Sequence, residues 1–163
     1  MRFYYYVIAL VVLILDFFSK KWIVNNMELR EEFSVIGDFF LITSHRNTGA
    51  AFGILEDQRI FFIIITIIIV SAIIWYVQSV RKSGSVILLA GLGLVLGGAI
   101  GNFIDRARFG EVVDFFKFNF GSYTFPIFNV ADSAIVVGVI LILLDTLLSI
   151  KEEKKGKVAI ENE

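Results

Sequence analysis

The chain contains no cysteine, which excludes disulfide bonds, thiol nucleophiles and thiolate metal sites and leaves the redox compartment undetermined. It has a single histidine, His45, so a zincin His-Glu-x-x-His pair is impossible and Ser-His catalysis would depend on that one residue. The net charge is −1 and no nucleic-acid-binding motif is present, so we expect no nucleic-acid partner. Only oxygen-rich groups remain for a metal site, and we expect neither a metal nor a cofactor.

Apolar residues dominate what is present. They make up 57% of the chain, aromatic residues make up 15%, and the mean hydropathy is +0.80, values typical of a membrane protein. Residues 60–80 and 83–104 are uncharged and long enough to span a bilayer. Residues 3–24 and 133–150 are also apolar but are interrupted by a few charges. We therefore predict an all-α membrane protein with a small β part and four transmembrane helices.

Four crossings would place both chain ends on one side of the membrane and the connections, residues 25–59 and 105–132, on the other. The dense Arg81-Lys82 turn and the lysine-rich residues 151–163 favour cytoplasmic ends. Residues 1–163 are thus expected to form one integral-membrane domain with both termini in the cytoplasm. No small-residue cleavage site follows the first apolar stretch, which we expect to stay attached, and residues 151–163 are expected to be a solvated, partly disordered tail.

Both connections contain patterns typical of short strands. In the first, residues 33–43 form a β-prone run that is broken by a turn at Gly37-Asp38. In the second, phenylalanines alternate with polar residues over 116–120, and Gly121-Ser122 offers a turn before residues 123–125. Unpaired strand edges are not tolerated in lipid, so we predict a small sheet on the outer membrane surface. Its phenylalanines would contact lipid or line a groove for an apolar substrate.

Two features of the helices suggest packing more than chemistry. Asp16 and Lys20 are four residues apart, in the order that favours a helical ion pair, and a structural clamp explains them. Gly93, Gly97 and Gly101 form a small-residue stripe that permits close contact between helices.

Polar residues gather at the end of the third apolar stretch and in the first connection. Asn102, Asp105 and Arg106 share one helix face, and either an ion-pair cluster or a functional site explains them. The stretch from His45 to Gly53 changes from polar to small residues, and on its own it is typical of a loop. A lone histidine such as His45 is more often structural than catalytic.

Asp114 and Asp132 are the strongest candidates for catalysis. Asp114 follows Val112-Val113 and precedes Phe115-Phe116, where desolvation favours its neutral form, whereas the start of a helix favours the anion of Asp132. Two carboxylates that share a site can divide the roles of acid and base in attack of water on a peptide carbonyl. Taken singly, Asp132 is more simply explained as a helix N-cap and Asp114 as an interface residue.

Five motif blocks together resemble the lipoprotein signal peptidases, the membrane aspartic enzymes of bacterial lipoprotein maturation. The resemblance extends along nearly the whole chain, through the blocks Asp16–Lys20, Asn47–Gly53, Gly101–Arg106, Val112–Phe115 and Phe128–Ser133.

The resemblance implies an enzyme that removes the signal peptide from diacylglyceryl-modified prolipoproteins, cutting just before the lipidated cysteine, without metal or cofactor. The residues that match the family's catalytic pair are Asp114 and Asp132. Those expected to line or support the site are Asn47, Gly49, Asn102, Arg106 and Asn129, with Asp16, Lys20 and Asp105 as structural ion pairs.

The family fold is four transmembrane helices with an extracytoplasmic β-cradle, in the bacterial cytoplasmic membrane. The resemblance implies an active site near the outer surface, where membrane lipid and the signal peptide are the partners, and we expect a monomer. Two other classes stay open at this point. An acid-gated small transporter would use the carboxylates to carry protons or cations, although transporters usually place such groups near the bilayer midplane. A non-catalytic lipid-binding scaffold would require neither aspartate.

Overall fold

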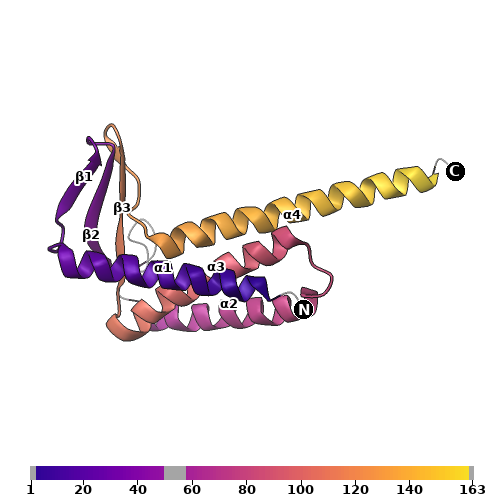
Figure 1. Ribbon diagram of the computed structural model, residues 1–163, viewed down its shortest axis with the longest axis horizontal. Coiled ribbons are helices and arrows are strands. Elements are labelled where there is room, and N and C mark those ends of the chain that lie inside the picture. The colour runs from indigo at the N-terminus through magenta and orange to yellow at the C-terminus, as the bar shows by residue number, and fades with distance from the viewer. Residues whose placement is uncertain (1–2, 50–57, 162–163) are drawn as a thin grey trace.

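The computed structural model describes residues 3–49 and 58–161, in which helices lie side by side and a small antiparallel sheet stands at one end of them (Figure 1). The helices are α1 (Tyr4–Asn26), α2 (Arg59–Val80), α3 (Val86–Phe109) and α4 (Val130–Glu161). The strands are β1 (Glu32–Ile36), β2 (Phe40–Asn47), β3 (Val112–Phe120) and β4 (Tyr123–Thr124). The prediction of a mostly helical protein with a small β part is confirmed.

In the described part of the chain, three helices are long and apolar enough to cross a membrane: Arg59–Val80, Val86–Phe109 and the Val130–Glu152 part of α4. α2 shows why lipid is needed, because Val77 is its one buried residue and its isoleucines are exposed on several sides. α1 has 23 residues, a length of about 35 Å, but charged residues interrupt its apolar sequence. The structure therefore supports three of the four predicted spans on composition.

α3 is the central helix and packs against α1, α2 and α4. The predicted glycine stripe faces α1, because a Cβ on Gly93 would lie 2.6 Å from the carbonyl oxygen of Tyr5, and a Cβ on Gly97 equally close to that of Ala9. A second close contact, which the sequence analysis did not predict, joins Gly98 on another face of α3 to the backbone of Ala131 on α4. Because these glycines have no side chain, α1 and α4 can pack closely against α3. The polar residues at the sheet end of the three helices are thereby brought together.

The sheet has the strand order β1-β2-β3-β4 and every pairing is antiparallel. The turns predicted at Gly37-Asp38 and Gly121-Ser122 are confirmed, and both glycines have positive φ, +47° and +65°. A bulge interrupts the β2–β3 register between Ile42, which pairs with Phe116, and His45, which pairs with Asp114. Because the two residues between them in β2 face a single residue in β3, the side chains of β2 change faces at this point.

Three boundaries differ from the sequence prediction. α3 continues to Phe109 and ends at Gly110, which adopts φ +82°, so residues 105–109 are helical and do not belong to the second connection. α4 continues to Glu161, so residues 151–161, which the sequence predicts to be a partly disordered tail, are helical. Residues 45–47 lie in β2 and not in a loop, because they pair with β3. Residues 50–53, the last part of the predicted loop from His45 to Gly53, lie outside the described residues.

Figure 1 shows the sheet at one end of the helices and both marked chain ends toward the other. The ends of α1 and α3 and the start of α4 therefore meet the sheet. This is where the candidate catalytic residues are found.

Candidate active site

Asp114 lies on β3 and is almost completely buried, with 1% of its surface exposed. Each of its carboxylate oxygens accepts one amide hydrogen bond. Asn129 Nδ2 donates to Oδ1 at 2.7 Å, and Asn47 Nδ2 donates to Oδ2 at 2.8 Å. The bulge in β2 places Asn47 on the face of the sheet that Asp114 occupies, so the carboxylate is fixed from two sides.

Asp132 lies in the first turn of α4 and is half-buried. Asn102 Nδ2 on α3 donates to its Oδ1 at 2.7 Å, and the backbone N–H of Asn129 donates to its Oδ2 at 3.2 Å. In return, Asn129 Oδ1 accepts from the backbone N–H of Asp132 at 2.9 Å. This reciprocal pair is a capping box in which Asn129, not Asp132, is the N-cap. The N-cap interpretation of Asp132 is therefore wrong.

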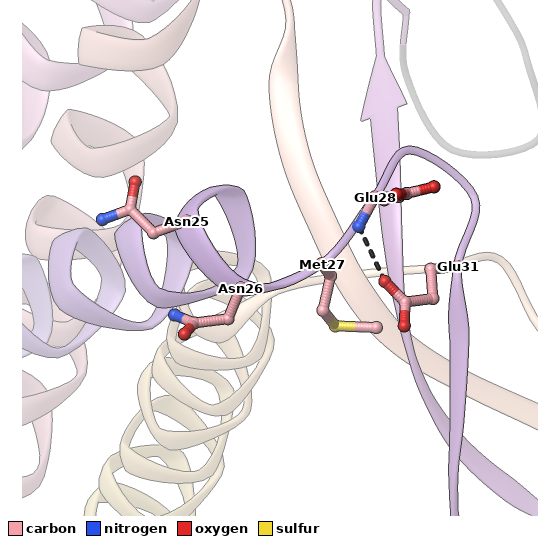
Figure 2. Close-up of a pocket in the computed structure, with 5 residues that line it drawn as sticks. All are labelled: Asn25, Asn26, Met27, Glu28 and Glu31. Carbon is pink, nitrogen blue, oxygen red and sulfur yellow. Dashed lines mark hydrogen bonds between the residues drawn. The ribbon is translucent and has the colours of Figure 1, made fainter.

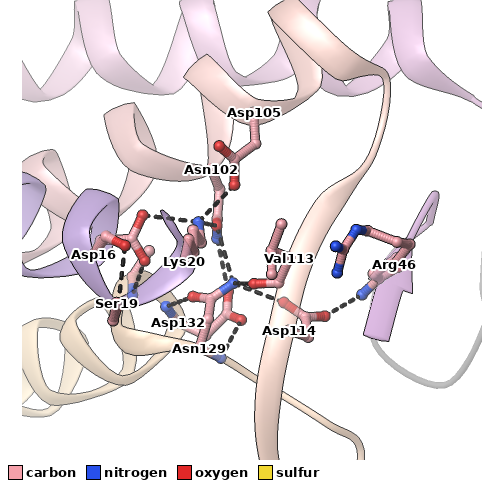
Figure 3. Close-up of polar contacts among 12 residues, drawn as sticks. Asp16, Ser19, Lys20, Arg46, Asn102, Asp105, Val113, Asp114, Asn129 and Asp132 are labelled. Carbon is pink, nitrogen blue, oxygen red and sulfur yellow. Dashed lines mark hydrogen bonds and ion pairs between the residues drawn. The ribbon is translucent and has the colours of Figure 1, made fainter. Parts of the chain in front are cut away.

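Asn129 joins the two carboxylates, because its side chain binds Asp114 while its backbone and side chain hold Asp132 (Figure 3). Burial, with a smaller contribution from repulsion by Asp132, raises the pKa of Asp114 from its ordinary value of 3.8 to about 7. Hydrogen bonds from Asn47 and Asn129 act against this shift. We call Asp114 and Asp132 the aspartate pair. At neutral pH Asp114 can therefore hold a proton beside the second carboxylate.

A buried ion cluster lies behind the aspartate pair (Figure 3). The predicted pair of Asp16 and Lys20 is present at 2.7 Å, and Lys20 also contacts Asp105 at 2.9 Å. Lys20 Nζ donates to Asn102 Oδ1 at 2.9 Å, so the cluster is connected to the residue that holds Asp132. Asp105 therefore belongs to the ion pairs, as predicted, and Asn102 belongs to both groups.

Arg106 is one helical turn beyond Asn102 on α3. Its guanidinium lies over the ring of Phe62 at 4.6 Å from the centroid, and Nη2 donates to the carbonyl oxygen of Gly49 at 2.8 Å. The backbone N–H of Gly49 in turn donates to Asn47 Oδ1 at 2.9 Å. Arg106 and Gly49 thus fix the side chain of Asn47, and through it Asp114.

A cavity of about 760 Å³ opens beside the aspartate pair. Its polar wall is formed by Asn47, Thr66, Asn102, Arg106, Asp114, Asp132 and Ser133. The rest of the wall is apolar and comes from α2, α3, α4 and the segment between β4 and α4, including Phe62, Ile69, Val95, Phe125, Phe128 and Val136. A site of this kind accepts an extended apolar ligand and presents two carboxylates to it at one point.

A second hollow of about 670 Å³ lies between the end of α1 and the start of the sheet (Figure 2). It is lined by Asn25, Asn26, Met27, Glu28 and Glu31, and the backbone N–H of Glu28 donates to Glu31 Oε2 at 2.7 Å.

The described residues contain no group of three or more His, Cys, Asp or Glu side chains that could hold a metal ion. The absence of metal from the reaction stays a prediction.

His45 is the register partner of Asp114, but within the described part of the chain its side chain makes no hydrogen bond to the aspartate pair. Burial lowers its pKa, and the positive charges of Arg30 and Arg46 lower it further.

The role that sequence analysis missed is that of Asn129 as the link between the carboxylates. The spacing of Asn129 and Asp132, three residues apart before an apolar run, was the available signal for a capping box.

Comparisons with known proteins agree on one family. The family described as Signal peptidase (SPase) II matches residues 8–148. A lipoprotein signal peptidase of Bacillus pumilus (strain SAFR-032) is 50% identical over 153 residues, which cover 94% of this chain and 98% of that protein. A bacterial membrane enzyme solved by the in meso method at 2.3 Å is 44% identical with a TM-score of 0.82, over 90% of this chain and 88% of the other. A second such structure, at 1.9 Å, is 45% identical with a TM-score of 0.77, over 86% and 90%.

Proposed function

The chain belongs to the signal peptidase II family of aspartic proteases and removes signal peptides from prolipoproteins, and we propose that Asp114 and Asp132 carry out the cleavage. The observation that supports this assignment is the pair of carboxylates, each fixed by two hydrogen bonds, beside a mostly apolar cavity. Family membership decides against the transporter and scaffold alternatives.

The two carboxylates divide the chemistry of peptide hydrolysis. Asp132 accepts a proton from the attacking water, because a helix N-terminus and two hydrogen-bond donors favour its anion. Asp114, with a pKa of about 7, donates its proton to the carbonyl oxygen of the scissile bond. The tetrahedral intermediate collapses when the leaving amine takes the proton held by Asp132, and the proton of the intermediate's hydroxyl returns to Asp114.

Four residues hold this pair in position. Asn47 and Asn129 fix Asp114, Asn102 fixes Asp132, and Arg106 fixes Asn47 by way of Gly49. Fixing both carboxylates before substrate binds lowers the reorganisation needed in the transition state.

The substrate that fits the cavity is a prolipoprotein modified with diacylglyceryl on cysteine, cut just before that cysteine. The apolar wall built by α2, α3 and α4 is suited to the apolar signal peptide and the acyl chains, whereas the aspartate pair lies at the sheet end where the lipid-bearing cysteine would reside. Membrane lipid and the signal peptide are then the partners. We propose that a monomer carries out this cleavage.

We also propose four membrane spans, with α1 as the fourth. Its Asp16 and Lys20 are buried at 1% and 4% exposure and paired with each other, so they do not meet the lipid. With four crossings the sheet and the aspartate pair lie on the extracytoplasmic side of the bacterial cytoplasmic membrane, and both termini lie in the cytoplasm. The sheet is then the extracytoplasmic cradle.

The decisive experiment is cleavage of a purified precursor, followed by gel shift. The enzyme in lipid should cut the diacylglyceryl-modified precursor far faster than the same precursor without the modification. EDTA should not change the rate, since the site uses carboxylates alone. Equal cleavage of both precursors would refute the lipid requirement, and loss of activity in EDTA that zinc or calcium restores would refute the metal-free mechanism.

A further inference from the structure

Lys20 is a buried ammonium that contacts three oxygens. It is 4% exposed, and its Nζ lies 2.7 Å from Asp16 Oδ2 and 2.9 Å from Asp105 Oδ2 and donates to Asn102 Oδ1 at 2.9 Å. A simple clamp for α1 needs only the contact with Asp16, which is four residues away on the same helix. The other two contacts reach α3, 82 residues along the chain in the case of Asn102.

The contact with Asn102 decides which way its amide faces. Lys20 can only donate hydrogen bonds, so the oxygen of Asn102 must face Lys20 and its Nδ2 must face the other way. Nδ2 then donates to Asp132 Oδ1 at 2.7 Å. Asn129 Nδ2 donates to the same oxygen of Asn102 at 3.2 Å, a longer contact, so Lys20 and Asn129 together set the orientation of Asn102 and with it one of the two hydrogen bonds on Asp132.

A second path leads from Lys20 to the same helix turn. Asp16, the ion-pair partner of Lys20, accepts a hydrogen bond through Oδ1 from the backbone N–H of Ala131 at 3.0 Å. Ala131 directly precedes Asp132 and is fully buried. Lys20 thus positions both the side chain and the backbone at Asp132.

From these contacts we infer that Lys20 is a positioning residue of the cleavage reaction, which holds Asp132 in place through Asn102 and Asp16 and keeps its negative charge available. The inference rests on the proposed role of Asp132. It gives Lys20 a part in turnover beyond the structural ion pair that the sequence suggests.

The charges around Asp132 determine the direction of the expected effect. α1 contributes Asp16 and Lys20, α3 contributes Asp105 and Arg106, and β3 contributes Asp114. Loss of the positive charge at Lys20 makes an anion at Asp132 less favourable, so activity should need a higher pH to appear. Loss of a negative charge at Asp105 should have the opposite effect.

The test uses the full-length enzyme in lipid with the diacylglyceryl-modified precursor. Lys20→Met removes the charge and all three donors but keeps an unbranched chain. We expect kcat to fall roughly 10- to 100-fold with little change in KM, since a lost charged hydrogen bond in a buried site has this magnitude. The acid limb of the pH–rate profile should move to higher pH. The matched control is Lys21→Met, which alters the adjacent lysine, exposed beside Phe17, and should leave kcat unchanged.

Asp105→Asn keeps an acceptor for Lys20 and provides the second measurement if Lys20→Met does not fold. The acid limb of the pH–rate profile of Asp105→Asn should move to lower pH. The inference is refuted if folded Lys20→Met has the kcat and pH profile of the wild type, or if Asp105→Asn moves the acid limb upward or not at all. Failure of the proposed function would give a different result, because the wild type and Lys21→Met would then also leave the precursor uncut. In that case the proposed role of Lys20 would be refuted as well.

Discussion

A single residue, Asp114, illustrates how much of this site depends on environment. It carries the same carboxyl group as Asp132, but it lies at 1% exposure between β2, β3 and the start of α4, and burial raises its pKa to about 7. Asp132 lies in a helix first turn with a backbone N–H donor. One chemical group therefore takes two roles because of its location.

Replacement of either aspartate should abolish most activity without unfolding the protein. Asp114→Asn and Asp132→Asn keep the size of the side chain and remove the proton transfer, so each should lower kcat by roughly 10²- to 10⁴-fold. The double variant should be scarcely slower than either single one, because the residues act as a unit. Turnover of the modified precursor by variants expressed at normal level measures this.

The control is Asp145→Asn, which alters a carboxylate bonded to Ser85 at the other end of the helices and should leave kcat unchanged. Near wild-type cleavage by either Asp114→Asn or Asp132→Asn would show that the aspartic mechanism is wrong.

Stability should depend on pH through Asp114. Because the pKa of Asp114 is about 7 in the folded state and near 3.8 when unfolded, the folded state binds more protons between these values. Its contribution to stability is complete below about pH 4 and is lost as pH rises through 7, by up to roughly 4 kcal/mol. Asp114→Asn removes this loss. The melting temperature of the variant, measured relative to that of the wild type, should therefore be higher at pH 8 than at pH 5.

Thermal unfolding in detergent at the two pH values measures this effect. Ser122→Ala, which exchanges neutral residues at an exposed turn, should follow the wild type at both pH values. A constant difference between Asp114→Asn and the wild type would contradict the raised pKa.

At the scale of elements, two local features bring the site together. The bulge in β2 places Asn47, the register partner of Val112, on the same face of the sheet as Asp114, so that its amide donates to the carboxylate. The glycines of α3 allow α1 and α4 to approach closely, which lets Lys20 and Asp132 meet Asn102 from opposite sides. Neither feature carries a functional group, yet both determine the distances within the site.

A larger side chain at the α3–α4 contact should therefore impair folding. A Cβ at Gly98 would collide with the carbonyl oxygen of Ala131, a backbone atom that cannot rotate away. Gly98→Val should destabilise the protein by about 1–3 kcal/mol or more and move Asp132 away from Asn102. Melting temperature and kcat should both fall. Ala72→Val, the same kind of enlargement at an exposed position on α2, should change neither, and equal effects of the two would contradict close packing at Gly98.

At the scale of the whole molecule, the site gathers residues from α1, α3, α4, β2 and β3 at one end of the helices. The chain ends lie toward the other end (Figure 1). This arrangement suits a substrate whose apolar segment lies in the bilayer and whose cleavage point lies at its surface, because the cavity joins apolar helix faces to the aspartate pair.

The proposed topology can be tested with single cysteines, because the chain has none of its own. Ser34, Ser122 and Ser83 are all exposed. Ser34→Cys and Ser122→Cys lie on the sheet side and should react with a membrane-impermeant maleimide in intact cells, whereas Ser83→Cys, between α2 and α3, should react only after the cells are opened. Labelling of Ser34→Cys and Ser122→Cys from different sides would exclude both the four-span topology and a site shared by the two connections.

The sequence by itself determined the helices, the strands and the candidate carboxylates. Long uncharged stretches have few alternatives to a membrane helix, and Gly37 and Gly121 marked the turns because positive φ favours glycine. The motif blocks identified Asp114 and Asp132, and the four-residue spacing of Asp16 and Lys20 predicted their ion pair, since both depend on local order along the chain.

The tertiary structure alone decided how these residues work together. Contacts such as Lys20 with Asn102 and Asn129 with Asp114 join segments that the sequence leaves unrelated, and their geometry depends on helix packing and on one bulge. The raised pKa of Asp114 likewise follows from burial by several elements at once. Local sequence fixes which groups are available, whereas their distances and charges are set by long-range packing.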